Sequence, residues 1–134
     1  MGYRRAGRER ALQMLYGRDV GKFSDDEILR DYRTIGALSP QVREFAEQLF
    51  TNVAGRLDEL DQLIQGHAWN WRLDRMATVD RNVLRLAAFE LLSGDRSPAS
   101  AIINEAIELA RKFSTQDSAQ FVNGILDSIL KSRE

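Results

Sequence analysis

Apolar residues recur at spacings of three and four along most of the 134-residue chain, which is the period of an amphipathic α-helix. No segment shows the alternation of a strand, and no internal repeat is present. The apolar stripes lie at residues 11–16, 42–53, 57–64, 79–92, 102–113 and 121–129. The stripe at 79–92 extends around most of the circumference, so we expect that helix to lie at the centre of the core. The pattern predicts an all-α fold with six or seven helices and short connections.

Residues with capping chemistry mark where several of these helices begin or end. Ser24 and Glu27 have the spacing of a capping box, in which each side chain accepts a hydrogen bond from the other residue's backbone N–H. Ser39 followed by Pro40 predicts an N-cap and a first helical position, where the N–H that proline lacks has no helical partner. Gly94 is placed to end the central helix as its C′ residue.

The composition excludes most catalytic chemistry. Cysteine is absent and histidine occurs once, as His67, so thiolate nucleophiles and metal sites built from several Cys or His ligands are impossible. The glycine-rich phosphate-binding motifs and the nucleophile elbow are also missing. We therefore expect a protein that is not an enzyme, with no metal and no cofactor, and a structural or solvated role for His67.

Length and hydropathy predict a single domain spanning residues 1–134. The chain carries 19 basic and 20 acidic side chains, for a formal charge of −1. Its apolar runs are far shorter than the ~20 residues that cross a bilayer, and the basic N-terminus lacks the apolar segment of a secretory signal. We expect a cytoplasmic protein that does not associate with membranes.

Positive charge is concentrated at the N-terminus. The first 18 residues contain five arginines and one glutamate, whereas residues 19–62 carry ten acidic and five basic side chains. At about 100° per residue, Arg4, Arg5 and Arg8 share the arc of the apolar residues that follow them. Guanidinium groups at the rim of a core match phosphate oxygens and stack on bases. The pattern alone also fits a solvated terminus whose arginines bind nothing.

Two further segments hold candidate binding residues. Trp69 and Trp71 could stack on unpaired bases, but a tryptophan pair of this kind more often fills the gap between helical layers. Asp117 or its polar neighbours precede the last apolar stripe, where a helix N-terminus suits a cap or a phosphate. Gly124 interrupts that stripe, which indicates that another helix or a ligand approaches the backbone closely there, and a helix is the more common reason.

Four sequence blocks, taken together, resemble the NusB family of bacterial transcription antitermination factors. The blocks are RERALQMLY at 8–16, VDRNVLRLAAFEL at 79–91, INEAIELAR at 103–111 and FVNGILD at 121–127. They occur in the order and spacing of the family, and the resemblance runs from about residue 4 to about residue 130. It implies an all-helical fold of two small packed bundles.

The resemblance also implies a function. NusB-like proteins pair with the small-subunit ribosomal protein NusE, bind the single-stranded boxA element of nascent RNA, and help RNA polymerase to elongate through ribosomal RNA operons, with no catalytic step or cofactor. The implied RNA-binding residues are Arg4, Arg5, Arg8, Arg10, Asp117, Ser118, Gln120 and Phe121, and the implied partner-binding residues are Tyr16 and Asp80. Gln120 stands where many relatives have a basic residue, so we expect phosphate binding here to depend more on the arginines or the partner.

Two other functions fit the same pattern. A NusB-like module also docks ribosomal RNA methyltransferases onto RNA, although this sequence has neither the strand pattern of a Rossmann fold nor a catalytic cysteine. A helical adaptor that binds only proteins is the second alternative. An exposed partner-binding face can also pair with itself, which would make the free protein a homodimer.

Overall fold

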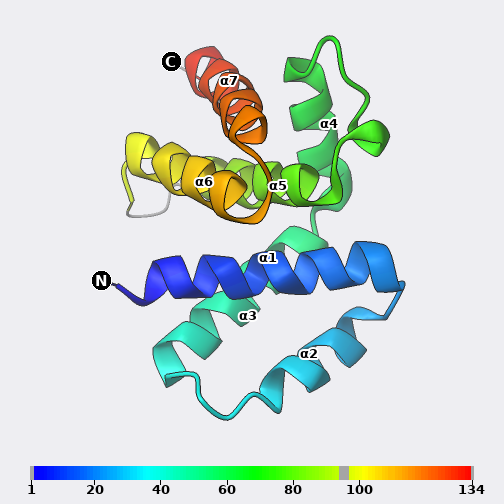
Figure 1. Ribbon diagram of the computed structural model, residues 1–134, viewed down its shortest axis with the longest axis vertical. Helices are drawn as coiled ribbons and strands as arrows, with labels where there is room; N and C mark the ends of the chain where they lie inside the picture. The colour runs from blue at the N-terminus through cyan, green and yellow to red at the C-terminus, as the bar shows by residue number, and fades with distance from the viewer. Residues whose placement is uncertain (1, 94–96, 134) are drawn as a thin grey trace. The chain divides into compact units, whose positions relative to one another are not determined.

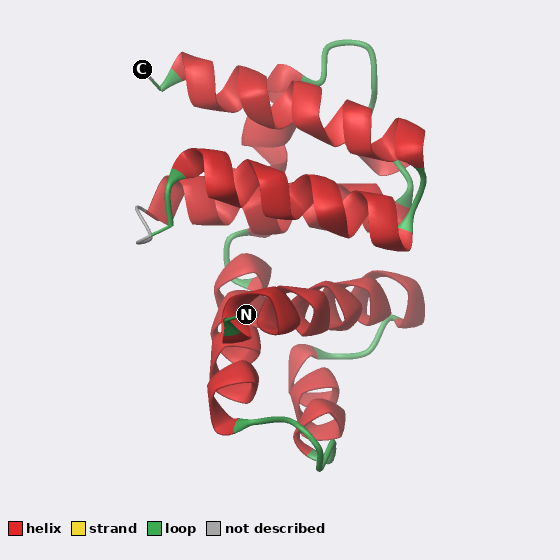
Figure 2. Cartoon of the chain, turned by 60° about the vertical axis from the view of Figure 1, so that its left-hand side comes forward, coloured by secondary structure: helices red, strands yellow, loops and turns green. Residues whose placement is uncertain are grey.

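The computed structural model describes residues 2–93 and 97–133, which form seven α-helices, one short 3₁₀ helix and no strand (Figure 1 and Figure 2). The elements are α1 (Tyr3–Gly21), α2 (Asp25–Arg33), α3 (Pro40–Ala54), α4 (Leu57–His67), η1 (Leu73–Arg75), α5 (Thr78–Ser93), α6 (Ala99–Phe113) and α7 (Gln116–Ser132). The all-α prediction is confirmed. The chain divides into two compact units, an N-terminal unit Met1–Gly55 and a C-terminal unit Arg56–Glu134.

Capping side chains fix the helix starts that the sequence predicted. Ser24 Oγ accepts a hydrogen bond from Glu27 N–H at 3.1 Å, and Glu27 Oε1 accepts one from Ser24 N–H at 2.9 Å, so the capping box is present. Ser39 caps α3 through its hydroxyl oxygen, with Pro40 at the first helical position. The predicted helix stop at Gly94 lies outside the described residues.

In the N-terminal unit, α1 packs along α3, and α2 contacts both helices. The buried side chains are Ala11, Leu12, Met14 and Leu15 of α1, Ile28 and Tyr32 of α2, and Ala46, Leu49, Phe50 and Val53 of α3. Gly7 allows the close approach of α1 to α3, because a Cβ at this position would lie 2.5 Å from Cδ2 of Phe45. A larger residue would therefore have to displace the Phe45 ring.

The central helix of the C-terminal unit is α5, which packs against α4, α6 and α7. All residues from 82 to 90 are buried, which confirms its predicted place in the core. Arg85 within this stretch forms a bidentate ion pair with Asp61 of α4, with Nε–Oδ1 and Nη2–Oδ2 distances of 2.8 and 2.9 Å. Its Nη1 also donates to Asn82 Oδ1 at 3.0 Å. The buried guanidinium therefore ties α5 to α4.

Two expectations about close packing are wrong. Trp69 and Trp71 are 82% and 56% exposed, so their indoles do not fill a gap between helical layers. In the same connection, Ala68 and Met76 are the buried residues. Gly124 has open space where a Cβ would project, because it lies on the exposed side of α7 and no helix approaches it there.

The described part of the chain contains neither a membrane-spanning helix nor a cluster of metal-ligating side chains. None of its helices combines the length and apolar character needed to cross a bilayer. No group of three or more His, Cys, Asp or Glu side chains there is placed to hold a metal ion. His67 Nδ1 lies 2.7 Å from Ser128 Oγ, a structural contact between α4 and α7.

Candidate nucleic-acid interface

The four arginines at the start of α1 differ in how far each is available to a ligand. Arg5 is exposed, Arg4 and Arg10 are half-buried, and Arg8 is only 5% exposed. Arg10 Nη1 donates to Gln13 Oε1 at 3.3 Å. The predicted arginine set is therefore not one uniform cationic surface, and Arg5 is its most accessible member.

Aromatic rings lie against two of these arginines. The guanidinium carbon of Arg8 is 5.7 Å from the centroid of the Phe45 ring, and that of Arg4 is 5.7 Å from the centroid of the Tyr3 ring. The two rings meet edge to face, with centroids 5.7 Å apart and an interplanar angle of 79°. Since a cation over an aromatic face is more stabilising when it is desolvated, Arg8 contributes to the packing of α1 on α3.

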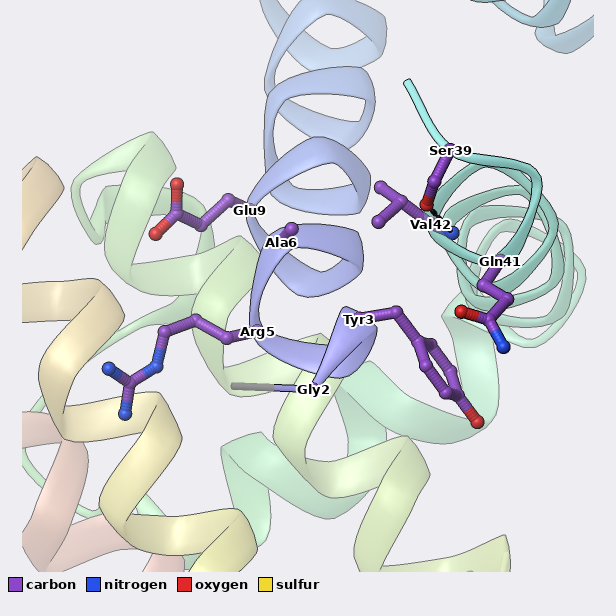
Figure 3. Close-up of a pocket in the computed structure, with 8 residues that line it drawn as sticks. All are labelled: Gly2, Tyr3, Arg5, Ala6, Glu9, Ser39, Gln41 and Val42. Atoms are coloured by element: carbon purple, nitrogen blue, oxygen red, sulfur yellow. Dashed lines mark hydrogen bonds between the residues drawn. The ribbon is translucent and has the colours of Figure 1, made fainter.

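A groove of about 490 Å³ is lined by the first turns of α1 and by the start of α3. In Figure 3, Tyr3 projects from α1 on the side where Gln41 and Val42 of α3 lie. Arg5 and Glu9 project from the opposite side of α1. Arg5 and Glu9 are one helical turn apart, so an acid accompanies the most accessible guanidinium. The positive field at this end of α1 is therefore weaker than the number of arginines suggests.

Tyr16, the predicted partner-binding residue of α1, is 43% exposed. Val20 lies one turn further along the same helix and is also exposed, and Phe23 is exposed in the connection to α2. Residues four apart on a helix share a face, so Tyr16 and Val20 present apolar surface together. Tyrosine is frequent at protein interfaces because its ring buries a large area while its hydroxyl retains a hydrogen bond.

The second predicted RNA-binding region forms the first two turns of α7. Asp117 and Gln120 are exposed, Phe121 is half-buried and Ser118 is buried. The helix is capped by Thr115, not by Asp117, since Thr115 Oγ1 accepts a hydrogen bond from Ser118 N–H at 3.0 Å. Asp117 is therefore an exposed first-turn carboxylate, a position that the helix dipole favours.

Ser118 connects α7 to α5 through Asp80. Its hydroxyl donates to Asp80 Oδ2 at 2.9 Å, and its oxygen lies 2.9 Å from Ser114 Oγ and 3.1 Å from Thr115 Oγ1. Because Ser118 donates its one proton to the carboxylate, it acts as the acceptor for the other two hydroxyls. The Asp80 side chain is 7% exposed. The structure thus joins two residues that the sequence analysis assigned to different surfaces, and Asp80 is buried against α7.

Beside this network lies a groove of about 370 Å³, which we call the α5–α7 groove. Its lining residues are Trp71, Arg75, Met76, Ala77, Asp80, Asp117, Ser118 and Phe121. The rings of Trp71 and Phe121 meet edge to face, with centroids 5.7 Å apart and an interplanar angle of 77°. Aromatic side chains in an open groove are the usual platform for unpaired bases.

The connection that carries Trp71 is held in place by Gln65 of α4. Gln65 Nε2 donates to the carbonyl oxygens of Ala68 and Trp71 at 3.3 and 2.7 Å, and its Oε1 accepts from Leu73 N–H at 2.8 Å. The side chain of Gln65 thus binds backbone atoms before, at and after residue 71. The backbone that carries the exposed Trp71 is therefore held in place.

Sequence reasoning identified Trp71 and Phe121 separately but missed their contact, and it assigned no role to Gln65 or Arg75. An isolated glutamine near a helix end gives no periodic signal. Arg75 was visible only as a second arginine close to the tryptophans. The proximity of Trp71 to Phe121 depends on the packing of the C-terminal unit, which no local pattern encodes.

Comparison of the sequence with known proteins identifies its relatives. The profile of the NusB family matches residues 5–131. The transcription antitermination proteins NusB of Koribacter versatilis and Myxococcus xanthus are each 45% identical to this chain, over 131 and 133 residues. The alignments cover 97% and 96% of this chain and 90% and 95% of the relatives. These relatives are transcription antitermination factors, which confirms the expectation that this chain is not an enzyme.

Solved structures give the same result. The structure of T. maritima NusB is 35% identical, with a TM-score of 0.88, and the match covers 96% of this chain and 90% of that chain. A crystal structure of the antitermination factors NusB and NusE in complex with double-stranded RNA contains a chain 27% identical, with a TM-score of 0.86 and 98% coverage of both chains. On the family profile, the curated relatives and the fold together, this chain belongs to the NusB family.

Proposed function

We propose that this protein is a transcription antitermination factor that binds boxA-type single-stranded RNA together with the ribosomal protein NusE and promotes elongation by RNA polymerase through ribosomal RNA operons. Membership of the NusB family supports the general role. The observation that carries RNA binding is the α5–α7 groove, where exposed Trp71 and half-buried Phe121 line an open cavity at a predicted RNA-binding region.

In this proposal, RNA is bound through local features, since a net charge of −1 gives no bulk attraction. Arg5 supplies an exposed guanidinium for a phosphate, and Arg4 and Arg10 add to it from half-buried positions. Arg8 acts mainly by holding the start of α1 on α3. Asp117, Ser118, Gln120 and Phe121 form the part of the interface on α7.

The proposed NusE-binding face includes Tyr16, whose exposed ring needs no rearrangement to meet a partner. Asp80 acts there indirectly, by fixing the start of α5, because its own side chain is buried. If NusE also contacts the RNA, the pair of proteins binds a longer stretch of RNA than either protein alone. Once one protein has bound, the effective RNA concentration at the other protein is raised. The similar structure that contains NusB and NusE with RNA supports both kinds of partner.

Fluorescence anisotropy with a labelled boxA-like RNA tests the proposal. Titrations use this protein alone, NusE alone and the two together, and we expect the pair to bind at least about tenfold more tightly than either protein. Three phosphate contacts predict that log K falls against log salt with a slope of about −2.

Strandedness is tested in the same assay, because the similar NusB–NusE structure contains double-stranded RNA. A duplex of the boxA-like sequence should compete poorly with the single strand, since stacking on Trp71 and Phe121 requires unpaired bases. Equal competition by the duplex would contradict the single-strand preference. No binding of either RNA, with or without NusE, would leave only an adaptor that binds proteins.

A further inference from the structure

The connection between α4 and α5 carries Trp71 through a stretch that has no buried residue of its own. Residues 69–72 are all exposed, and the buried residues Ala68 and Met76 lie on either side of them. We propose that Gln65 of α4 is a positioning residue for RNA binding, because its side chain holds this connection in the shape that presents Trp71. The inference rests on the proposed RNA binding and goes beyond it by naming a residue that acts through Trp71.

Gln65 uses both ends of its amide group on the connection. Its Nε2 donates to the carbonyl oxygens of Ala68 and Trp71 at 3.3 and 2.7 Å, and its Oε1 accepts from Leu73 N–H at 2.8 Å. The bond to Trp71 is the shortest of the three. An amide side chain has two N–H donors and one acceptor oxygen, so a single glutamine satisfies all three backbone groups at once. Alanine at this position would make none of these bonds.

The other hydrogen bonds of the connection lie on either side of the segment that Gln65 holds. Trp71 N–H donates to the carbonyl oxygen of Ala68 at 3.1 Å, which closes the turn that precedes Trp71. Arg81 Nη1 of α5 donates to the carbonyl oxygen of Leu73 at 3.3 Å, which fixes the start of η1. Gln65 binds the two backbone groups between these points, the Trp71 carbonyl and Leu73 N–H. Loss of its amide therefore loosens the backbone directly after Trp71.

The position of this backbone matters for the α5–α7 groove. Trp71 and Phe121 both line the groove, and their rings meet edge to face with centroids 5.7 Å apart. Gln65 is not among the residues that line the groove, so its effect on RNA passes through the connection. If the connection adopted several conformations, only the fraction with Trp71 at the groove would bind RNA, and the apparent affinity would fall by that fraction.

A double-mutant cycle tests the positioning role. Wild type, Gln65→Ala, Trp71→Ala and the double variant are titrated, each with NusE, into the labelled single-stranded boxA-like RNA and followed by fluorescence anisotropy. If about one tenth of the Gln65→Ala molecules hold the competent conformation, this variant binds about tenfold more weakly than wild type. We expect Trp71→Ala to weaken binding at least as much, and the double variant to bind no more weakly than Trp71→Ala alone.

The matched control is Gln62→Ala, which removes an exposed glutamine one turn earlier on the same helix and should bind RNA like wild type. Losses that multiply in the double variant would show that Gln65 acts independently of Trp71 and would overturn the positioning role. Wild-type affinity in Gln65→Ala would overturn it as well, while the proposed function would stand. If wild type itself binds no RNA, the proposed function fails and the positioning role fails with it.

Amide hydrogen exchange separates local positioning from general destabilisation. Leu73 N–H donates to Gln65 Oε1, so Gln65→Ala should speed its exchange more than that of the buried amides at 82–90 in α5. An equal increase at Leu73 and in α5 would show that the substitution weakens the whole C-terminal unit, and the positioning role would then be wrong.

Discussion

Ser118 and Asp80 form the buried hydrogen bond that joins α7 to α5, with Ser118 Oγ 2.9 Å from Asp80 Oδ2. Asp80 lies in the first turn of α5, where the helix dipole favours its negative charge. Hydrogen bonds to a charged acceptor are roughly twice as strong as neutral ones. Because both residues line the α5–α7 groove, the same bond also sets the shape of that groove.

Ser118→Ala should therefore destabilise the protein. The substitution leaves the buried Asp80 carboxylate without its hydroxyl donor, and we expect the free energy of unfolding to fall by about 1.5–3 kcal/mol. Urea denaturation followed by circular dichroism measures the change. Ser114→Ala is the matched control, because Ser114 belongs to the network only through Ser118 and should lose about 1 kcal/mol or less. If Ser114→Ala lowered the free energy of unfolding as much as Ser118→Ala, the predicted difference between the two variants would be wrong.

The ion pair between Arg85 and Asp61 predicts a larger effect. Asp61→Ala removes the carboxylate that accepts two hydrogen bonds from the buried guanidinium, which then keeps only Asn82 among the side-chain partners described above. We expect a loss of about 3 kcal/mol in the free energy of unfolding. Arg72 and Asp74 form an exposed pair at 2.9 Å, so Asp74→Ala should change the stability by less than about 1 kcal/mol. Similar losses for the two variants would show that burial is not the deciding factor.

The helices were predictable from the sequence because their signals are local. Apolar spacing located the stripe of each helix, and Ser24, Ser39 and Pro40 marked where two of them begin. The gap between the apolar stripes at 42–53 and 57–64 agrees with the end of α3 at Ala54 and the start of α4 at Leu57. These features depend on residues within one or two turns of each other.

The candidate site was predictable only in part because its contacts are not local. Whether Trp71 is buried depends on Gln65, Ala68 and Met76, which decide by hydrogen bonding and packing which residues of the connection face inward. The bond between Asp80 and Ser118 crosses from α5 to α7, and no spacing rule pairs them. Sequence reasoning therefore found residues of the site but not their arrangement.

Arg5→Ala tests the phosphate contact at the start of α1. Because Arg5 is exposed, we expect the folded stability to be unchanged, RNA affinity to fall equally for every RNA sequence, and the salt slope of log K to decrease by about 0.7. Fluorescence anisotropy across a salt series gives both quantities. Arg30→Ala, an exposed arginine of α2 outside the predicted set, should leave the slope unchanged. An unchanged slope for Arg5→Ala would remove this residue from the interface.

Tyr16→Ala tests the partner-binding face. Removing an exposed ring should hardly change the free energy of unfolding, but loss of a central tyrosine commonly weakens a protein interface by about 2 kcal/mol, or roughly thirtyfold in Kd. Isothermal titration calorimetry with NusE measures the affinity. Trp69→Ala removes another exposed aromatic ring in the C-terminal unit and should leave it unchanged. Equal effects of the two variants would show that Tyr16 is not a specific contact.

The capping box of α2 predicts a pH dependence of stability. The Ser24 backbone N–H, and secondarily its side chain, holds the pKa of Glu27 below its usual value of 4.5. A carboxylate whose pKa is lower in the folded state stabilises the protein above its unfolded pKa, and that contribution is lost as the pH falls through the folded pKa. Urea denaturation between pH 7 and pH 3 should therefore show wild type more stable than Glu27→Gln at pH 7, with the two converging in acid.

Ser24→Ala is the control for the backbone contribution. It keeps the backbone donor, so it should lose about 1 kcal/mol of capping stability but retain part of the pH dependence. If the free energy of unfolding of Ser24→Ala depended on pH no more than that of Glu27→Gln, the lowered pKa of Glu27 would be due to the Ser24 hydroxyl and not to its backbone N–H.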